Sequence, residues 1–325
     1  MATYLVTGAA GFIGSRVIHL LIADGHQVIG IDNLNDAYDV RMKQYRLELL
    51  KPLAGFTFFQ EDILNRAAMT DIFKKHGPIQ AVIHLAARAG VRAAAENPYI
   101  YLETNSNGTL NLLELCRHYD VPKFLMASTS SIYGGNPPIP TTEEADSSHP
   151  LQPYAASKKA AEVMAYTYHH LYKLDISIVR YFTVYGPAPR PDMVMFRFAQ
   201  WVFEGRTVRI TGDGSQSRGF TYLDDIARGT ILALKPLGYE IINLGGHQVI
   251  SINDLLAMIE KLSGKTAQRE YIEFHPADVM ENFANVNKAR SLLGWQPKFT
   301  LEEGVANLVD WYRAQRSWAS QILTP

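Results

Sequence analysis

The chain has 325 residues, of which 47% are apolar, so it can bury a substantial core as one large domain or two smaller ones. Its 31 basic and 32 acidic side chains nearly cancel, which gives no electrostatic reason to expect nucleic acid or an anionic membrane as a partner. The apolar runs are too short to span a bilayer, and the N-terminus does not resemble a signal peptide. Because Cys116 is the single cysteine, it cannot form an intramolecular disulfide, and we expect a cytoplasmic protein.

Short β-rich runs alternate with helical patterns through the first half of the chain, which predicts an α/β fold with a doubly wound parallel sheet of the Rossmann type. We expect six strands, at Tyr4–Thr7, Val28–Asp32, Phe56–Gln60, Ala81–Leu85, Lys123–Ser128 and Ile176–Tyr181. We expect helices at about Gly11–Ala23, Arg66–Lys75, Tyr99–Tyr119 and Tyr154–Leu171. Beyond Tyr181 glycine and proline interrupt the pattern, which indicates a smaller, mixed α/β region. We therefore divide the chain into domains 1–182 and 183–325, with an interleaved boundary.

A glycine-rich turn follows the first strand and opens the first helix, with the sequence Gly8-Ala-Ala-Gly11-Phe12-Ile13-Gly14. In this context the first glycine permits the tight turn, the second lets a pyrophosphate approach the backbone, and the third lets the helix pack closely on the sheet. Helix amides and the helix dipole then face the phosphates. The pattern predicts a dinucleotide site.

Asp32 ends the second strand, where a carboxylate can bind the adenosine ribose and would repel an added 2′-phosphate, so we expect NAD as the cofactor rather than NADP. Further candidate cofactor contacts lie near the ends of later strands or on the long helix, where each could equally be a loop cap or a packing residue. They are Asn33, Asp62, Ile63, Leu85, Ala86, Ala87, Asn105 and Tyr181.

Tyr154 and Lys158 stand four residues apart, so a helix places both side chains on one face. To act as a base near neutrality, the tyrosine needs its pKa lowered from about 10 to about 7, which requires roughly 4 kcal/mol. Lys158 and a positively charged nicotinamide can supply that stabilisation. Thr129, at the end of the fifth strand, offers a hydroxyl between Tyr154 and a substrate oxygen. The alternative is that Tyr154 packs, Lys158 is solvated and the Thr129 region caps a strand.

The ten histidines show no metal-ligand spacing, and the adjacent His169 and His170 would face different directions on a helix. We predict no metal site.

Together these motifs resemble the extended short-chain dehydrogenases/reductases, in particular the nucleotide-sugar epimerases and dehydratases. The resemblance covers nearly the whole chain. It rests on Gly8 to Gly14, Asp32-Asn33, His84-Leu-Ala-Ala87, Ser128 to Gly134, Tyr154 to Lys158, Arg180 to Pro187 and Gly212 to Arg218. Within the family, Tyr181 to Pro187 followed by Arg190-Pro-Asp-Met193 is most similar to the UDP-glucuronate 4-epimerases.

The resemblance implies an NAD-binding domain at 1–182 and a nucleotide-sugar-binding domain at 183–325. It also implies a UDP-sugar substrate inverted at carbon 4 through a 4-keto intermediate, with Tyr154 as base, Lys158 on the nicotinamide ribose and Thr129 on the sugar hydroxyl. The family forms homodimers, and the apolar residues on several sides of the helices at Tyr99–Tyr119 and Tyr154–Leu171 suggest burial against a second subunit here. Ordinary packing within the chain is the alternative explanation of that pattern.

For the sugar carboxylate, the resemblance implies Ser130, Ser131, Thr183 and Arg190, with Arg92 facing the same sugar. Arg190 can offer a fork of donors matched to a carboxylate. For the nucleotide it implies Arg218 on a phosphate, with Arg209 and Asp278 near the uridine. The chain departs from the usual family pattern in two places, with Ala188-Pro189 instead of Trp-Gly and Gly219 instead of an acid.

Three other functions stay open on the sequence. A 4-epimerase of a neutral UDP-sugar and a UDP-glucuronate decarboxylase share the same site residues. A sensor that only binds NAD would have no need of an activated phenol. A dehydratase is disfavoured because Ser130-Ser131 replace the acidic pair that elimination would use.

Overall fold

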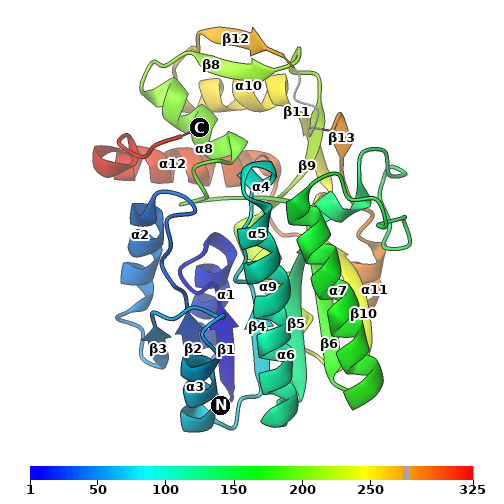
Figure 1. Ribbon diagram of the computed structural model, residues 1–325. Helices are drawn as coiled ribbons and strands as arrows, with labels where there is room; N and C mark the ends of the chain where they lie inside the picture. Colours follow the sequence, from blue (N-terminus) through cyan, green and yellow to red (C-terminus); the bar gives the residue numbers. More distant parts are fainter. Residues whose placement is uncertain (92, 274–278, 325) are drawn as a thin grey trace.

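A parallel sheet of seven strands forms the centre of the molecule in a computed structural model that describes residues 1–91, 93–273 and 279–324 (Figure 1). Its strand order is β10-β6-β5-β4-β1-β2-β3, and every pair is parallel. The strands are β1 (Thr3–Thr7), β2 (Gln27–Ile31), β3 (Phe56–Phe59), β4 (Ala81–His84), β5 (Lys123–Thr129), β6 (Asp175–Tyr181) and β10 (Tyr239–Leu244). The prediction of a doubly wound α/β sheet is confirmed.

The predicted count of six strands is wrong, because β10 adds a seventh strand beside β6. Tyr239 pairs with Ile176 and Leu244 pairs with Tyr181. This strand comes from the region that we assigned to the second domain. The chain thus leaves the seven-stranded sheet after β6, forms part of the smaller region, and returns to add β10 to the sheet.

Helices cover both faces of the sheet, with α3, α6 and α7 on one face and α1 and α9 on the other (Figure 1). The helices around the seven-stranded sheet are α1 (Phe12–Ala23), α2 (Val40–Leu50), α3 (Arg66–His76), α4 (Ala93–Glu96), α5 (Pro98–Tyr101), α6 (Gly108–His118), α7 (Pro153–Tyr172) and α9 (Leu223–Leu232). The predicted helix at Tyr99–Tyr119 is not a single α-helix, because a π-helical segment, η1 (Leu102–Asn107), separates α5 from α6.

Helix α2 was not predicted, and its burial pattern explains why. The helix buries Lys43 and Arg46 together with Met42, Leu47 and Leu50. Charged residues on the inner face hide the apolar periodicity on which a helix prediction depends.

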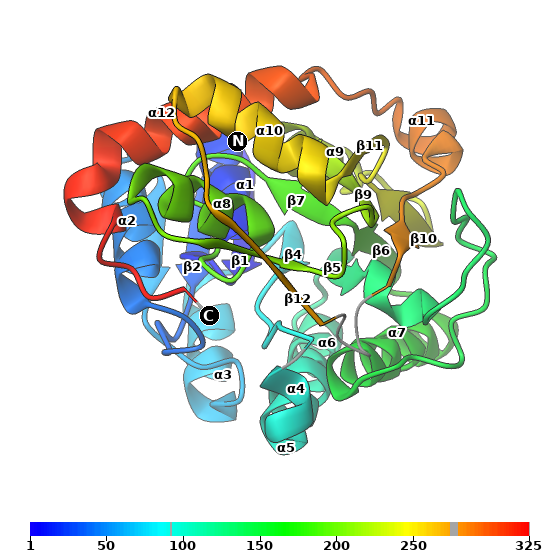
Figure 2. The same cartoon turned by 90° about the horizontal axis from the view of Figure 1, so that it is seen from above.

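The smaller region lies over the carboxyl ends of the sheet strands, as the views from the side and from above both show (Figures 1 and 2). Strand β9 (Ser217–Tyr222) pairs with β7 (Thr183–Tyr185), β11 (Gln248–Ser251) and β13 (Glu281–Asn282), while β8 (Val208–Thr211) pairs with β12 (Arg269–Ile272). Its helices are α8 (Val194–Phe203), α10 (Ile252–Ser263), α11 (Asn287–Leu293) and α12 (Leu301–Ala319). A separate core forms among α8, α10 and α12, around Phe196, Leu255 and Tyr312.

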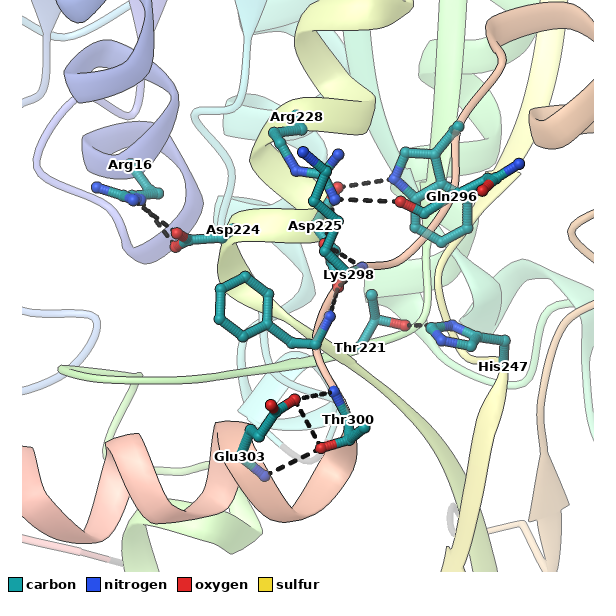
Figure 3. Close-up of polar contacts among 12 residues, drawn as sticks. Arg16, Thr221, Asp224, Asp225, Arg228, His247, Gln296, Lys298, Thr300 and Glu303 are labelled. Atoms are coloured by element: carbon teal, nitrogen blue, oxygen red, sulfur yellow. Dashed lines mark hydrogen bonds and ion pairs between the residues drawn. The ribbon is translucent and has the colours of Figure 1, made fainter.

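A polar junction at the start of α9 ties the smaller region to the sheet layer (Figure 3). The fully buried carboxylate of Asp225 accepts hydrogen bonds from the amides of Lys298 and Phe299 and pairs with Arg228. Beside it, Asp224 forms a two-pronged ion pair with Arg16 on α1. The junction thus holds the segment that leads into α12 against α9.

None of the described helices is both long enough and apolar enough to cross a membrane.

Candidate active site

The glycine-rich turn has the shape that a phosphate-binding turn needs. Gly8 has φ +71°, and a Cβ there would lie 2.8 Å from the amide nitrogen of Ala86. A Cβ on Gly11 would lie 2.8 Å from the Gly8 carbonyl oxygen, and one on Gly14 would overlap the same atom. Gly11 is the N-cap of α1 and has no side chain to cap the helix, so the first amides of α1 are available to an anion. These residues fit a dinucleotide pyrophosphate.

Asp32 follows β2 and is buried beside this turn. Its carboxylate accepts hydrogen bonds from the amides of Ala10 at 3.1 Å and Leu34 at 2.9 Å, and Lys43 Nζ lies 3.5 Å away. Oδ1 accepts from both Leu34 and Lys43, whereas Oδ2 accepts from Ala10, so Oδ2 can still accept a bond from a ribose hydroxyl. Asn33 donates to Asp62 at 2.7 Å, which brings the loops after β2 and β3 together beside Asp32.

The other candidate cofactor residues divide between the cleft wall and the core. Leu85 and Ala86 are half-buried and Ala87 is exposed just after β4. Ile63 is buried against Gly108, and Tyr181 is buried with its hydroxyl 2.7 Å from that of Thr230, so their side chains belong to the core.

Asn105 lies in the π-helical segment and is fully buried. Its side-chain amide bonds both the amide and the carbonyl of Arg88, at 2.8 and 3.0 Å, and donates to Ser157 at 2.9 Å. Ser157 in turn donates to the carbonyl of Tyr154. Asn105 therefore fixes the loop after β4 against the helix that carries Tyr154 and Lys158.

His84 continues this network toward β1. The Thr109 hydroxyl donates to the Asn105 carbonyl at 2.6 Å, so it can only accept from His84 Nε2 at 3.0 Å. In a neutral ring with its proton on Nε2, Nδ1 accepts from the Thr7 hydroxyl at 2.8 Å, and the Thr7 oxygen accepts from the Ala86 amide at 3.2 Å. The neutral form of His84 thus satisfies every group of this network. Burial, reinforced by the charge of Lys158, lowers the pKa of His84 well below its ordinary 6.5.

Tyr154, Thr129 and Lys158 come together where β5 ends and α7 begins. The side chain of Thr129 hydrogen-bonds to the Tyr154 phenol, and its oxygen also accepts from the Ser131 amide at 3.1 Å. Lys158 lies one helical turn beyond Tyr154 and is 2% exposed. Burial lowers the pKa of Lys158 to about 8, partly opposed by the charge of Glu162, which is held in a buried ion pair with Arg180 at 2.7 Å.

The protein groups alone do not lower the pKa of Tyr154. Burial raises it above the ordinary value of 10, and the Thr129 hydrogen bond and the charge of Arg190 oppose that rise. The shift toward neutrality that base catalysis requires must therefore come from further positive charge beside the phenol. The positive nicotinamide ring of a bound dinucleotide would supply such a charge.

Arg190 lies near Tyr154, on the loop between β7 and α8, and its charge acts on the pKa of that phenol. Its Nε and Nη2 donate to Asp192 at 3.0 and 2.5 Å. Burial would lower the pKa of Arg190, but Asp192 outweighs it and raises that pKa. The Tyr101 ring packs edge-on against Tyr154 with 6.3 Å between centroids, so Tyr101 is a site residue that the sequence did not reveal.

The remaining candidate sugar and nucleotide residues lie on the smaller region or facing it. Ser130 is buried and accepts from Asn282 on β13 at 3.1 Å, and Thr183 is half-buried on β7. Arg218 on β9 donates to the carbonyls of Ser217 and Met280 at 2.7 and 3.0 Å. Arg209 is exposed and pairs with Glu270 at 3.1 Å.

Arg92 and Asp278 lie outside the described residues. Arg88, which we did not predict, lies on the loop after β4 and reaches to within 4.0 Å of Asp36 on the loop after β2. Its position just after Leu85-Ala-Ala87 is the sequence signal that could have identified it. Within the described ranges, no group of three histidine, cysteine or acidic side chains is arranged to hold a metal ion.

Comparisons with known proteins agree with this geometry. Residues 4–245 match the family model "NAD dependent epimerase/dehydratase family". A UDP-glucuronate 4-epimerase of Thermodesulfobacterium geofontis is 57% identical over 96% of each chain. The crystal structure of the Bacillus cereus UDP-glucuronic acid 4-epimerase with UDP-glucuronic acid and NAD superposes with a TM-score of 0.90 at 36% identity, covering 96% of this chain and 99% of that one. A Thermotoga maritima UDP-glucose 4-epimerase with UDP-glucose gives 0.89 at 33% identity, covering 97% and 99%. The chain belongs to the NAD dependent epimerase/dehydratase family.

Proposed function

We propose that the protein is an NAD-dependent 4-epimerase that interconverts UDP-glucuronate and UDP-galacturonate. The observation that carries the proposal is that the Tyr154 phenol is hydrogen-bonded to Thr129, lies one helical turn from the buried Lys158, and is near enough to Arg190 for that charge to act on its pKa. A candidate base and a candidate carboxylate-binding group thus lie in the same part of the molecule. The similarity to UDP-glucuronate 4-epimerases supports the same substrate.

In the cleft, the glycine-rich turn and Asp32 bind the pyrophosphate and the adenosine ribose of NAD, and Asn33 with Asp62 border the adenine. When bound, NAD supplies a hydride acceptor in one half of the cycle and a donor in the other. Lys158 holds the nicotinamide ribose. Residues 1–182 together with β10 form the NAD-binding part, and the rest of 183–325 binds the UDP-sugar.

Tyr154 acts as the base that takes the proton from the sugar 4-hydroxyl, and Thr129 orients that hydroxyl. The reverse transfer from Tyr154 reprotonates the oxygen after the 4-keto sugar has turned over. Arg190, with Ser130, Ser131 and Thr183, binds the sugar carboxylate. Because the Asp192 ion pair uses Nε and Nη2 of Arg190, Nη1 is the nitrogen that we assign to the substrate.

The test is to incubate the protein with NAD and UDP-glucuronate and to resolve UDP-galacturonate from UDP-pentoses and carbon dioxide by NMR. UDP-galacturonate as the main product supports the epimerase. Pentose with stoichiometric carbon dioxide would identify a decarboxylase, and turnover of UDP-glucose alone would identify an epimerase of neutral sugars.

The mechanism predicts that Tyr154→Phe binds NAD as the wild type does but loses turnover by a factor of about 100 or more, since removing a positioned general base costs at least that much. Tryptophan fluorescence quenching measures NAD binding, and formation of UDP-galacturonate followed by NMR measures turnover. Wild-type turnover in Tyr154→Phe would contradict the assignment of the base.

We also propose a cytoplasmic homodimer joined through α5, η1 and α7. Six apolar side chains on these neighbouring helices are between 46% and 75% exposed, and a second copy packed on them would remove that apolar surface from water. They are Tyr99 (75% exposed), Leu102 (46%), Val163 (56%), Tyr166 (51%), Leu171 (64%) and Tyr172 (48%).

A further inference from the structure

Arg46 on α2 lies behind the glycine-rich turn, where its guanidinium is 3% exposed. One terminal nitrogen, Nη1, donates to the carbonyl of Ala10 in that turn at 3.1 Å and to the hydroxyl of Tyr38 at 2.9 Å. The guanidinium also lies over the rings of Phe12 and Tyr38, with its central carbon 5.9 and 5.6 Å from their centroids. One edge of Arg46 is therefore fixed to the cofactor side of the cleft.

The other edge of Arg46 grips the loop that carries Arg190. Nε donates to the Ala188 carbonyl at 3.0 Å, and Nη2 donates to the Pro189 carbonyl at 3.1 Å. Ala188 has φ +54°, a left-handed conformation that is unfavourable for any residue with a Cβ. A conformation of this kind persists only where the surroundings hold it in place. The two hydrogen bonds from Arg46 act directly on this strained peptide, which lies two residues before Arg190.

We propose that Arg46 is a positioning residue for recognition of the sugar carboxylate: it fixes the Ala188-Pro189 backbone so that Arg190 faces the substrate. This inference rests on the proposed function. A planar guanidinium can hold Ala10, Ala188 and Pro189 at once because its donors point in fixed directions, whereas a lysine ammonium could not span the same acceptors.

The orientation of the carboxylate matters because oxidation at carbon 4 creates a β-keto acid. If the bond between carbon 5 and the carboxylate stands perpendicular to the new carbonyl, it breaks, carbon dioxide leaves, and the bond electrons form an enolate that takes a proton at carbon 5. A displaced Arg190 would bind the carboxylate less well and restrain its orientation less. Loss of the clamp should therefore weaken substrate binding and increase this side reaction.

The experiment compares Arg46→Lys with the wild type and with Arg190→Ala. The matched control is Arg41→Lys, the same exchange on the same helix, where Arg41 forms a surface ion pair with Asp39. Calorimetry measures the dissociation constants of UDP-glucuronate and of UDP, which lacks the sugar acid. NMR measures carbon dioxide released per epimerisation. Thermal melts establish that each variant is folded.

We expect Arg46→Lys to bind UDP-glucuronate about tenfold more weakly, which corresponds to one displaced charge-assisted contact, while UDP binding changes by less than about twofold. Carbon dioxide per turnover should rise toward the value for Arg190→Ala, and Arg41→Lys should match the wild type. If Arg46→Lys weakens the binding of UDP and of UDP-glucuronate equally, Arg46 has only a structural role. If neither dissociation constant nor the carbon dioxide released changes, Arg46 does not position Arg190. Either result overturns the inference.

If Arg46→Lys does not fold, Pro189→Gly can be used instead, because it loosens the same loop. Pro189→Gly should then also weaken the binding of UDP-glucuronate but not that of UDP. If it does not, the inference is wrong. A wild-type protein that converts no UDP-glucuronate would instead overturn the proposed function. The two failures are therefore distinguishable.

Discussion

At the scale of single residues, His84 shows how the fold fixes a protonation state. The Thr109 hydroxyl donates its one proton to the Asn105 carbonyl, so Nε2 of His84 must be the donor to Thr109, and Nδ1 is the acceptor in the neutral ring. A protonated ring would direct an N–H at Thr7, whose own hydroxyl proton would have to turn away. The cofactor turn, the loop after β4 and the catalytic helix are thus joined through a neutral imidazole.

This arrangement predicts acid sensitivity of a definite sign. In the unfolded chain His84 binds a proton below about pH 6.5, whereas in the folded protein its pKa is well below that value. The unfolded state therefore binds the extra proton, and the free energy of unfolding falls by up to about 1.4 kcal/mol per pH unit as the pH drops below 6.5.

Urea denaturation at pH 7.5 and 5.5 measures this loss, with His84→Gln as the comparison because glutamine offers a donor and an acceptor but does not titrate. We expect the wild type to lose about 1 kcal/mol more than the variant between the two pH values. Identical losses would show that His84 is not the group responsible.

At the scale of elements, the junction around Asp225 joins α9 to the segment that leads into α12 (Figure 3). Asp225 and Asp224 are neighbours in sequence with similar partners but different burial. Asp225 is fully buried, while the side chains of Asp224 and Arg16 are 24% and 29% exposed. Solvent screens the second pair, so the two aspartates should contribute unequally to stability.

We expect Asp225→Asn to lower the free energy of unfolding by about 3 kcal/mol, because it leaves Arg228 without its counter-charge and turns an amide toward the backbone donors of Lys298 and Phe299. Asp224→Asn, the matched control, should lose about 1 kcal/mol or less. Guanidinium titrations of both variants measure the difference. Equal losses would mean that burial does not set the strength of this junction.

The elements that the sequence predicted well are those with local signals. The turn at Gly8 to Gly14 and helix α7 follow from glycine spacing and apolar periodicity, and α7 runs from Pro153 to Tyr172, within a residue of the predicted helix at each end. Strand β10 was missed because its partner β6 lies about sixty residues earlier and nothing local marks the pairing. The π-helical turn at Asn105 was missed because its side-chain bonds to Arg88 and Ser157 exist only in the fold.

The same reasoning applies to the site. Thr129, Tyr154 and Lys158 could be grouped from sequence because strand ends of a parallel sheet meet at one edge. Arg46 could not, because its acceptors include backbone carbonyls of residues 36 and 142 positions away.

At the scale of the whole molecule, the proposed dimer can be tested on α7. Introducing Val163→Asp and Tyr166→Asp together should convert the dimer to a monomer in sedimentation velocity, since two charges would be buried in an apolar interface. Val249→Asp on β11, whose residue is 46% exposed, is the control and should leave the dimer intact. A wild-type monomer at micromolar concentration would contradict the proposal.

Strand β10 also constrains how the chain emerges from the ribosome. A nascent polypeptide ending near residue 182 presents β6 as a bare edge, with hydrogen-bonding groups from Ile176 to Tyr181 open to any other strand. The dinucleotide-binding half cannot close until residues 239–244 have been synthesised. We therefore expect the sheet to be completed late in synthesis, and a pause in translation between these two segments to favour aggregation through the open edge of β6.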